Sequence, residues 1–417
     1  MTDGLTEGRH AATEAQARPR VMLLGSDEFA RQLAVALRRL GAEVIAIDEY
    51  PGAPAHGVAD QSLVVAMTNT DELRALIGGL QPDFVVSLAD AISVDALDAL
   101  AVGPDGEDHD VIELVPSARS VRITTDREGL RRLAADQLGL PTAPFWFVGS
   151  VGELKAVAAH AGYPLLVKGV AGAAGQGQSV IAGPEDVEAA WERAVGLGPG
   201  TAQHRVLAET VVEVKSFVTL LAVRSDGPNG PLIEFCAPIG HRDADGEVLE
   251  SWQPQKMSAA ALDAAKSIAA RIVKALGGRG IFGIELMING DEVYFVDVTA
   301  GPRDSAWVTA CSQRLSVFDL QARAILGLPV DAVMISPGAA RVIGPGHATG
   351  APGSEALTRA LGVPESDIQV FGPVTGTGPA GAKQKLGVAL ATAPDLDTAR
   401  DRAREVVTAL NMPASRG

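Results

Sequence analysis

The chain has 417 residues, of which 47% are hydrophobic and 21% are charged, and its formal net charge at pH 7 is −16. This length and composition predict a globular protein of two or three domains, not a disordered or coiled-coil chain. The acidic balance argues against nucleic-acid binding through a broad phosphate-neutralising surface. Two cysteines, Cys236 and Cys311, are too few for a disulfide framework, which predicts a reducing, cytoplasmic location.

The N-terminal third predicts a short tail followed by a parallel sheet. Residues 1–18 contain no apolar segment typical of a signal peptide, and we interpret them as a flexible tail. No later segment supplies the roughly 20 consecutive apolar residues of a membrane-spanning helix. Within residues 19–123, strands are predicted at 20–25, 44–48 and 84–87, and helices at 28–40 and 71–78. Such alternation predicts a Rossmann-like domain.

The rest of the chain predicts two further domains. Residues 124–330 contain longer strands and hairpin signals, such as the strands at 286–288 and 293–295, which predict an α+β domain with antiparallel strands. Residues 331–417 contain one clear strand and a closing helix, which predict a small β-rich C-terminal domain. The expected fold class is therefore mixed α/β and α+β.

Two local motifs point to functions that the remaining residues do not support. Gly25 to Ala30 resembles a dinucleotide-binding turn, but Asp27 and Ala30 replace its second and third glycines, so a nicotinamide enzyme is disfavoured. The triplet His241-Arg242-Asp243 matches a kinase motif in letters, without the accompanying Asp-Phe-Gly or strand lysine. We therefore assign this triplet no catalytic role.

A glycine-rich segment at residues 172–179 follows the strand predicted at 165–168. Its spacing resembles a Walker A loop, but Gln178 stands where that motif has lysine, which argues against a P-loop fold. Glycine permits positive φ values and close approach of the backbone to phosphate. A phosphate-binding loop is therefore one interpretation, and a plain hairpin turn is the other.

Two carboxylates, Glu285 and Asp297, lie among apolar residues on consecutive predicted strands. A carboxylate in such surroundings is costly to bury unless it is paired or bound to a cation. No charge partner is evident nearby in the sequence. Because Mg²⁺ prefers one or two carboxylates together with nucleotide phosphates, the pair predicts a magnesium site. The alternative is a pair of structural carboxylates that form salt bridges with Arg or Lys.

Taken together, these segments resemble the formate-dependent phosphoribosylglycinamide formyltransferase family of the ATP-grasp superfamily, from Val21 to about Ala409. The most specific similarities lie at residues 43–54, 126–135, 236–242, 250–255 and 386–391. The resemblance implies three domains, a homodimer, and ATP bound between two antiparallel sheets. It also implies a ligase that phosphorylates a carboxylate with ATP and then transfers the acyl group to an amine.

The resemblance also implies a role for individual residues. Phosphates would be held by Arg127 and Lys168, and the metal by Glu285 and Asp297. The loop over the phosphates would be formed by Ala173, Ala174, Gly175, Gln176, Gly177 and Gln178, and the adenine pocket by Glu209, Thr210, Val211 and Val212. The acceptor would contact Glu28, Phe29 and Asp304. Cations placed in this way suit phosphoryl transfer, which depends on positive charge around the transferring group.

Several positions depart from the family pattern. On the nucleotide side, Gln176 replaces a basic residue, Phe217 replaces an acidic ribose contact, and Gly301 replaces an arginine. Arg303 is the candidate substitute for that arginine, and it forms the predicted catalytic pair with Asp304. On the acceptor side the changed positions are Leu88, Pro373, Gln384 and Lys385, with Lys383 and Lys385 left to form a looser phosphate site. We therefore expect an altered acceptor pocket, with phosphoribosylglycinamide as a poor acceptor.

The leading hypothesis is an ATP- and Mg²⁺-dependent ligase that activates a small, formate-like carboxylate and transfers it to an amine. One alternative keeps this mechanism with a different carboxylate and amine, as in a specialised biosynthetic pathway. A second alternative is a catalytically silent nucleotide-binding protein. Gly301 and Gln176 favour the silent alternative, whereas the presence of Lys168, Glu285 and Asp297 argues against it.

Overall fold

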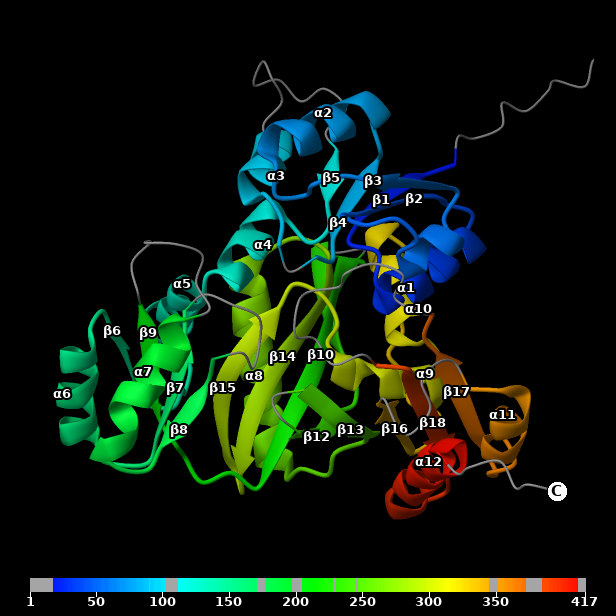
Figure 1. Ribbon diagram of the computed structural model, residues 1–417. Helices are drawn as coiled ribbons and strands as arrows, with labels where there is room; N and C mark the ends of the chain where they lie inside the picture. Colours follow the sequence, from blue (N-terminus) through cyan, green and yellow to red (C-terminus); the bar gives the residue numbers. More distant parts are fainter. Residues whose placement is uncertain are drawn as a thin grey trace, which may run out of the picture.

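The structure is a computed structural model, which describes residues 18–89, 91–101, 112–170, 177–196, 205–227, 230–244, 247–344, 352–372 and 385–411. Three sheets organise the described chain: an N-terminal parallel sheet, a small antiparallel sheet and a large antiparallel sheet (Figure 1). This arrangement confirms the predicted mixed fold class. No helix among the described residues is long and apolar enough to cross a membrane.

The N-terminal sheet has the strand order β3-β2-β1-β4-β5, and each neighbouring pair is parallel. Its strands are β1 (Arg20–Leu24), β2 (Glu43–Asp48), β3 (Gln61–Val64), β4 (Phe84–Ser87) and β5 (Glu113–Leu114). The helical segments are α1 (Glu28–Arg39), η1 (Pro54–Gly57), α2 (Thr70–Leu80) and α3 (Val94–Ala101). The central strands β1 and β2 consist almost entirely of buried residues, as expected for a parallel sheet covered on both faces.

The turn after β1 is held by contacts within the N-terminal domain. Asp48, at the end of β2, accepts a hydrogen bond from the backbone N–H of Ser26 at 2.7 Å. Gly25 has a φ of +108°, and a Cβ atom there would lie 2.8 Å from the backbone nitrogen of Ala89. The Asp48 carboxylate thus stabilises the turn itself.

Three helical segments, α4 (Ala118–Thr125), α5 (Arg127–Arg132) and η2 (Leu133–Gln137), lead from this domain to the small antiparallel sheet. The small sheet has the order β6-β9-β7-β8, and all of its pairs are antiparallel. Its strands and helical segments are β6 (Phe145–Val148), α6 (Val151–Ala161), β7 (Leu165–Gly169), β8 (Ser179–Ile181), η3 (Pro184–Asp186), α7 (Val187–Val195) and β9 (Val206–Thr210). Buried residues of α6 and α7 pack against these strands in one apolar cluster.

The large sheet contains nine strands among the described residues, in the order β15-β14-β10-β12-β13-β16-β18-β17, with β11 paired to β10. The strands before residue 330 are β10 (Ser216–Gly227), β11 (Gly230–Phe235), β12 (Ile239–Ala244), β13 (Glu247–Gln253), β14 (Gly280–Asn289) and β15 (Glu292–Thr299). The later strands are β16 (Gly338–Ile343), β17 (Ser366–Val370) and β18 (Gly387–Thr392). Helix α8 (Ala259–Leu276) packs its apolar face against β10, β14 and β15. The predicted C-terminal domain therefore extends the same sheet as the preceding strands.

Helices α11 (Ser354–Ala360) and α12 (Leu396–Asn411) pack on the C-terminal part of this sheet. The fully buried side chain of Glu250 on β13 joins the sheet to α12. Its carboxylate lies 2.8 Å from Arg400 Nε and 2.9 Å from Arg404 Nη2, and within 3.3 Å of Arg242 and Arg341. Because a buried charge must be paired, this network connects four elements of the fold.

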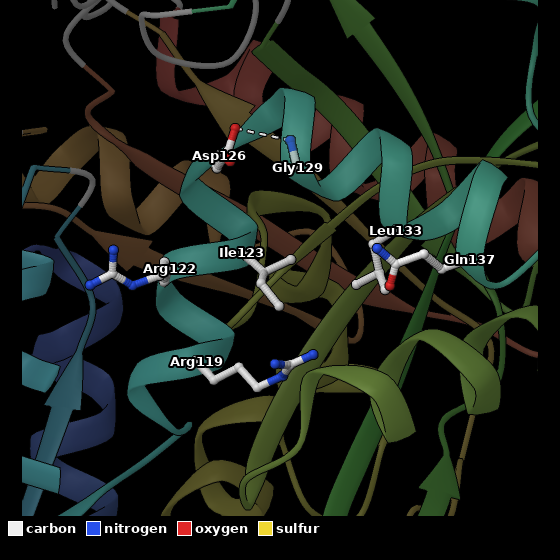
Figure 2. Close-up of a pocket in the computed structure, with 7 residues that line it drawn as sticks. All are labelled: Arg119, Arg122, Ile123, Asp126, Gly129, Leu133 and Gln137. Carbon is white, nitrogen blue, oxygen red and sulfur yellow. Dashed lines mark hydrogen bonds between the residues drawn. The ribbon is translucent and has the colours of Figure 1, made fainter. Parts of the chain in front are cut away.

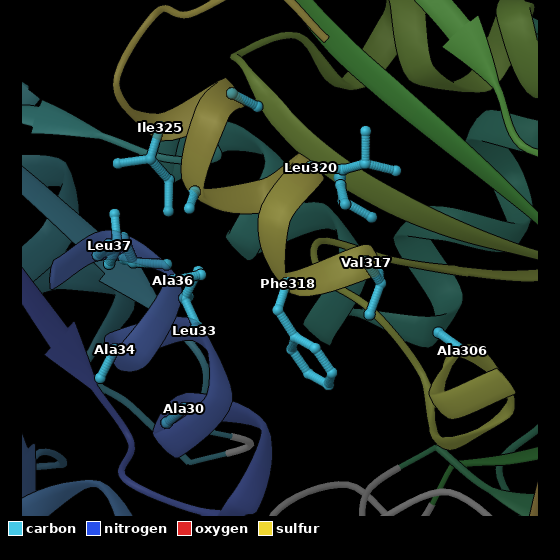
Figure 3. Packing of buried hydrophobic residues seen from close by; sticks show 14 of the residues in the cluster. Ala30, Leu33, Ala34, Ala36, Leu37, Ala306, Val317, Phe318, Leu320 and Ile325 are labelled. Carbon is cyan, nitrogen blue, oxygen red and sulfur yellow. The ribbon is translucent and has the colours of Figure 1, made fainter. Parts of the chain in front are cut away.

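The N-terminal domain is held against the large sheet by α1 and α10 (Val317–Ile325). Figure 3 shows Ala30, Leu33 and Leu37 of α1 on the side that faces α10, which presents Phe318 and Ile325. The segments η4 (Asp304–Val308) and α9 (Thr309–Ser312) lie directly before α10. This packing brings the start of α1 close to η4, and thereby places predicted site residues from two domains together.

Candidate functional site

The predicted metal ligands lie face to face on two neighbouring strands. Glu285 on β14 and Asp297 on β15 are direct partners in the antiparallel register, next to a register shift between Glu285 and Leu286. Arg303 lies beside both, with Nη2 2.6 Å from Asp297 Oδ2 and Nε 3.6 Å from Glu285 Oε1. That Nε is buried and has no hydrogen-bond partner among the described residues. The sequence prediction that the carboxylates lack a nearby charge partner is therefore wrong, because Arg303 folds back between them.

Glu285 is held by two further side chains. Thr219 on β10 donates its hydroxyl proton to Glu285 Oε1 at 2.7 Å, and His241 Nε2 on β12 lies 2.9 Å from Oε2. Burial alone would raise the pKa of Glu285, but hydrogen bonds from His241 and Thr219, with the charge of Arg303, hold this pKa below its ordinary value. Glu285 is consequently an ionised carboxylate with both oxygens engaged.

His241 links Glu285 to Asp243, because its Nδ1 lies 2.8 Å from Asp243 Oδ1. Burial opposes protonation of the imidazole, but the hydrogen bonds with Asp243 and Glu285 outweigh burial and raise the pKa of His241 to about 9. The side chain is therefore an imidazolium at neutral pH. The triplet that contains His241 lacks the companions of a kinase motif, yet its histidine contacts a predicted metal ligand, a contact that no local sequence pattern indicates.

Lys168, predicted to bind phosphate, forms an ion pair with Glu209 on the adjacent strand. Lys168 Nζ lies 2.7 Å from Glu209 Oε2, and Arg131 of α5 donates to Glu209 Oε1. Glu209 is buried, which would raise its pKa, but Lys168 and Arg131 outweigh this effect and lower the pKa. Glu209 was predicted to line an adenine pocket, which stays a prediction, and its carboxylate pairs with two cations. Arg131 is a further site residue that the sequence analysis did not identify.

The other predicted nucleotide contacts come from several elements of the two antiparallel sheets and from α5. Arg127 Nη1 donates to the carbonyl of Gly169, at the end of β7, at 2.7 Å. Thr210 ends β9, Val211 is exposed, Val212 is partly exposed, and Phe217 on β10 has a 47% exposed side chain. Of the predicted phosphate loop, Gly177 has a φ of +65° and Gln178 is exposed, whereas Ala173, Ala174, Gly175 and Gln176 lie outside the described residues.

The described acceptor residues come from four segments: α1, the residue after β4, η4 and the segment before β18. Glu28 Oε1 on α1 accepts a hydrogen bond from Gly372 N at 2.8 Å, and Lys385 forms an ion pair with Asp304 of η4. The Phe29 ring lies 4.7 Å from the ring of Trp307, centroid to centroid. Leu88 is partly buried against the apolar cluster to which Trp307 belongs and against which Phe29 also packs. Pro373, Lys383 and Gln384 lie outside the described residues.

A separate pocket lies beside α4 and α5 (Figure 2). Asp126 caps α5 there by accepting a hydrogen bond from Gly129 N at 3.0 Å. The pocket is lined by Arg119, Arg122, Ile123, Asp126, Gly129, Leu133 and Gln137. None of these residues belongs to the predicted site, so we do not connect this pocket with the chemistry of the carboxylate pair.

Two features define the class of protein. Lys168 and Arg131 pair with Glu209 at the small antiparallel sheet, and Glu285 and Asp297 form a carboxylate pair on the larger one. Residues 133–318 match the family model described as the ATP-grasp domain, so this is an ATP-grasp protein. The chain is 44% identical over 395 residues to formate-dependent phosphoribosylglycinamide formyltransferase of Corynebacterium glutamicum (strain R), with 94% of each chain covered. The corresponding identity to the Mycolicibacterium gilvum protein of that name is 45% over 391 residues, covering 93% of this chain and 95% of the relative. The chain belongs to the formate-dependent phosphoribosylglycinamide formyltransferase family, and is thus a homologue of ATP-dependent ligases.

Solved structures agree with this assignment. The structure of glycinamide-RNase-transformylase T from Mycobacterium tuberculosis matches with a TM-score of 0.79 and 64% identity, covering 94% of this chain and 100% of that chain. N5-carboxyaminoimidazole ribonucleotide synthetase from Thermotoga maritima has a TM-score of 0.77 at 20% identity, covering 94% and 98% of the two chains, and shares the fold. The altered acceptor pocket expected from Leu88, Pro373, Gln384 and Lys385 gains no support here. The relatives match 94% of the chain, far beyond the ATP-grasp domain at residues 133–318.

Proposed function

We propose that this chain uses ATP and Mg²⁺ to convert formate to formyl phosphate and transfers the formyl group to the amine of phosphoribosylglycinamide. The observation that supports this most is the pairing of Glu285 and Asp297 across β14 and β15, with Arg303 beside both carboxylates, inside the ATP-grasp domain. Relatives at 44% and 45% identity have names that describe this reaction.

The donor set fits a magnesium ion that is shared with nucleotide phosphates. Among the described residues, no group of three or more His, Cys, Asp and Glu side chains could hold a metal alone. Mg²⁺ usually takes one or two carboxylates and completes its shell with phosphate oxygens and water. Glu285 and Asp297 would supply the carboxylates, and the Nε of Arg303, which has no hydrogen-bond partner among the described residues, would be available to a phosphate oxygen. When bound, the cation would neutralise charge that develops on the transferring phosphoryl group.

Side chains of this protein would position the nucleotide. Lys168, paired with Glu209, would place a point charge against the phosphates. Arg127 of α5, which contacts the carbonyl of Gly169 at the end of the same strand, would lie next to it. Thr210, Val211 and Val212 would lie against the adenine, because Thr210 ends the strand that contains Glu209 and the two valines follow it directly. Positioning of this kind accounts for much of the catalysis of phosphoryl transfer, since the protein contributes little covalent chemistry.

The acceptor would bind where α1, η4 and the segment around residue 385 meet. Asp304 and Glu28 are carboxylates suited to an amine, and Lys385 supplies a positive charge for a phosphate or carboxylate group. The apolar rings of Phe29 and Trp307 support this surface from behind. Full-length similarity to named formyltransferases favours phosphoribosylglycinamide over another amine. The homodimer expected from the resemblance stays a prediction, which sedimentation equilibrium would test.

Steady-state assays with isotope-labelled formate test the proposal directly. We expect ADP release to require formate and Mg²⁺, and mass spectrometry to detect labelled formyl-phosphoribosylglycinamide in equal amount. A kcat/KM on the order of 10⁴ M⁻¹s⁻¹ or higher would be typical of a metabolic enzyme. Acetate in place of formate, and the acceptor without its phosphate, serve as controls. Formate-dependent ADP release without the formylated product would point to a different amine, and absence of ADP release would support a catalytically silent protein.

A further inference from the structure

A chain of two buried hydroxyl groups lies behind Glu285. Thr219 is fully buried and is the register partner of Glu285 across β10 and β14. Its Oγ1 lies 2.7 Å from Glu285 Oε1 and 2.7 Å from Ser305 Oγ. A carboxylate only accepts hydrogen bonds, so Thr219 uses its single proton on Glu285 and must accept the proton of Ser305. The hydrogen bonds therefore run in one direction, from Ser305 through Thr219 to Glu285.

Packing alone does not require these hydroxyl groups. On the same face of β10, Leu221 and Val223 are fully buried in the apolar cluster that also contains Ala306 of η4. A valine at position 219 would have nearly the same shape without a polar group to satisfy. Burying a hydroxyl group is costly unless it is hydrogen-bonded, so the position of Thr219 is explained by the carboxylate that it contacts.

The second oxygen of Glu285 is held from a different strand. His241 Nε2 on β12 lies 2.9 Å from Oε2, while Thr219 on β10 holds Oε1. Two donors on opposite oxygens restrict rotation of the carboxylate and leave its remaining lone pairs for a cation. A side chain restricted in this way loses less conformational entropy when it ligates a metal.

We propose that Thr219 is a positioning residue that fixes the Glu285 carboxylate for a divalent cation, and that Ser305 acts through Thr219. This inference rests on the proposed function, in which Glu285 is a metal ligand. Hydrogen-bond partners of metal ligands orient the ligands, and their loss typically weakens metal affinity or activity about 10- to 100-fold.

Isosteric variants separate the hydroxyl group from the shape of the side chain. Thr219→Val removes the donor, Thr219→Ser keeps it, and Ser305→Ala removes only the group behind it. The measurement is Mn²⁺ affinity in the presence of ADP, by electron paramagnetic resonance, with the Mg²⁺ dependence of KM and kcat for ATP determined in parallel. We expect Thr219→Val to weaken Mn²⁺ binding by about 10- to 100-fold, Thr219→Ser to restore it, and Ser305→Ala to fall between them.

Thr309 supplies a matched control for a buried hydroxyl. It is fully buried, donates to the carbonyl of Ala306 at 2.7 Å, and accepts from Val317 N at 2.9 Å. Thr309→Val should lower the melting temperature and leave Mn²⁺ affinity unchanged, because this hydroxyl bonds only to backbone within the described structure. Equal loss of Mn²⁺ affinity in the Thr219 and Thr309 variants would show general destabilisation and overturn the proposal.

Glu285→Gln separates failure of this inference from failure of the proposed function. Unchanged Mn²⁺ affinity in Glu285→Gln would refute the metal site itself. Loss of Mn²⁺ binding in Glu285→Gln, together with wild-type affinity in Thr219→Val, would refute only the positioning role. If Thr219→Val does not fold, Ser305→Ala decides the question, and wild-type affinity in that variant overturns the proposal.

Discussion

Glu285 and Asp297 lie directly opposite each other in the register of β14 and β15. Like charges at opposed positions of an antiparallel pair repel and destabilise the sheet. Arg303 contacts Asp297 at 2.6 Å and approaches Glu285 to 3.6 Å, so its guanidinium supplies the positive charge that the pair requires. Burial disfavours the charged guanidinium, but Asp297 and Glu285 outweigh this effect and raise the pKa of Arg303. The two carboxylates are therefore compensated by a side chain that lies within reach of both.

Removing this guanidinium should make the stability of the protein depend on Mg²⁺. We expect Arg303→Met to lower stability in EDTA by on the order of 2 kcal/mol, less than for a fully buried pair because Asp297 is partly exposed. Added Mg²⁺ should restore more stability in this variant than in the wild type, since a bound cation replaces the missing charge. Thermal unfolding in EDTA and in Mg²⁺ measures both effects, with Arg303→Lys as the charge-retaining control. An equal response of variant and wild type to Mg²⁺ would contradict the expectation.

Neutralising one ligand should abolish the reaction without unfolding the protein. We expect Glu285→Gln to lose Mg²⁺-dependent ADP formation, because an amide is a poor substitute for a carboxylate in a magnesium shell. Circular dichroism should remain that of the wild type. Glu292→Gln is a suitable control, since Glu292 is exposed at the start of β15, and hydrogen-bonds only to the nearby Tyr294 hydroxyl among the contacts described. Full activity in Glu285→Gln would place the metal elsewhere.

Lys168 should contribute to nucleotide affinity through its point charge. We expect Lys168→Ala to weaken ADP binding by roughly 10- to 100-fold, the value of a charge-assisted hydrogen bond of about 1.5–3 kcal/mol. Isothermal titration calorimetry with ADP provides the measurement. Lys155→Ala is the matched control, because Lys155 pairs with Glu188 at 2.5 Å on the surface of the same domain. Equal affinities for the two variants would exclude Lys168 from the phosphate site.

Local patterns in the sequence were sufficient to predict much of the fold. The hairpin that contains Glu285 and Asp297 follows from two apolar runs around a short turn, and the structure has this hairpin with Gly290 at a φ of +65°. Because side chains alternate along a strand, the two carboxylates could be predicted to lie near each other. The parallel N-terminal sheet was predictable for a similar reason, since apolar runs alternate with helical periods.

Contacts between distant segments were not predictable in this way. His241 and Glu285 are 44 residues apart and lie on strands separated by β10, so their contact depends on the order β14-β10-β12. Single-sequence periodicity gives strands but not their order in a sheet. The ion pairs of Glu209 with Lys168 and Arg131 likewise join β9 to β7 and α5. A buried histidine between two carboxylates has no local sequence signal, so the contact of His241 with Glu285 could not be predicted from the triplet at 241–243.

Asp304 should separate acceptor binding from nucleotide chemistry. We expect Asp304→Asn to raise KM for phosphoribosylglycinamide by roughly 10- to 100-fold, because a charge-assisted hydrogen bond is lost and Lys385 no longer faces a carboxylate. Formate-dependent ADP release without acceptor should persist, since Lys168 and Glu285 are unchanged. Measurement of the formylated product against ADP tests this, with Asp331→Asn, which removes a surface pair with Arg314, as control. A parallel loss of both signals would assign Asp304 to the nucleotide step.

Glu250 on β13, which is not part of the carboxylate pair, should make the stability of the protein depend on pH. Burial alone would raise the pKa of Glu250, but Arg400 and Arg404 outweigh burial and hold it below its ordinary value of 4.5. A lowered folded-state pKa stabilises the protein above the unfolded pKa, and this contribution is lost as pH falls through the folded value. Glu250→Gln should therefore cost about 3 kcal/mol at pH 7, and the difference from the wild type should shrink only below pH 4.5. Urea unfolding from pH 7 to pH 3.5 measures this, with Glu405→Gln on the exposed side of α12 as control. A difference that stays constant through the acid range would show that Glu250 stabilises the protein by shape and not by charge.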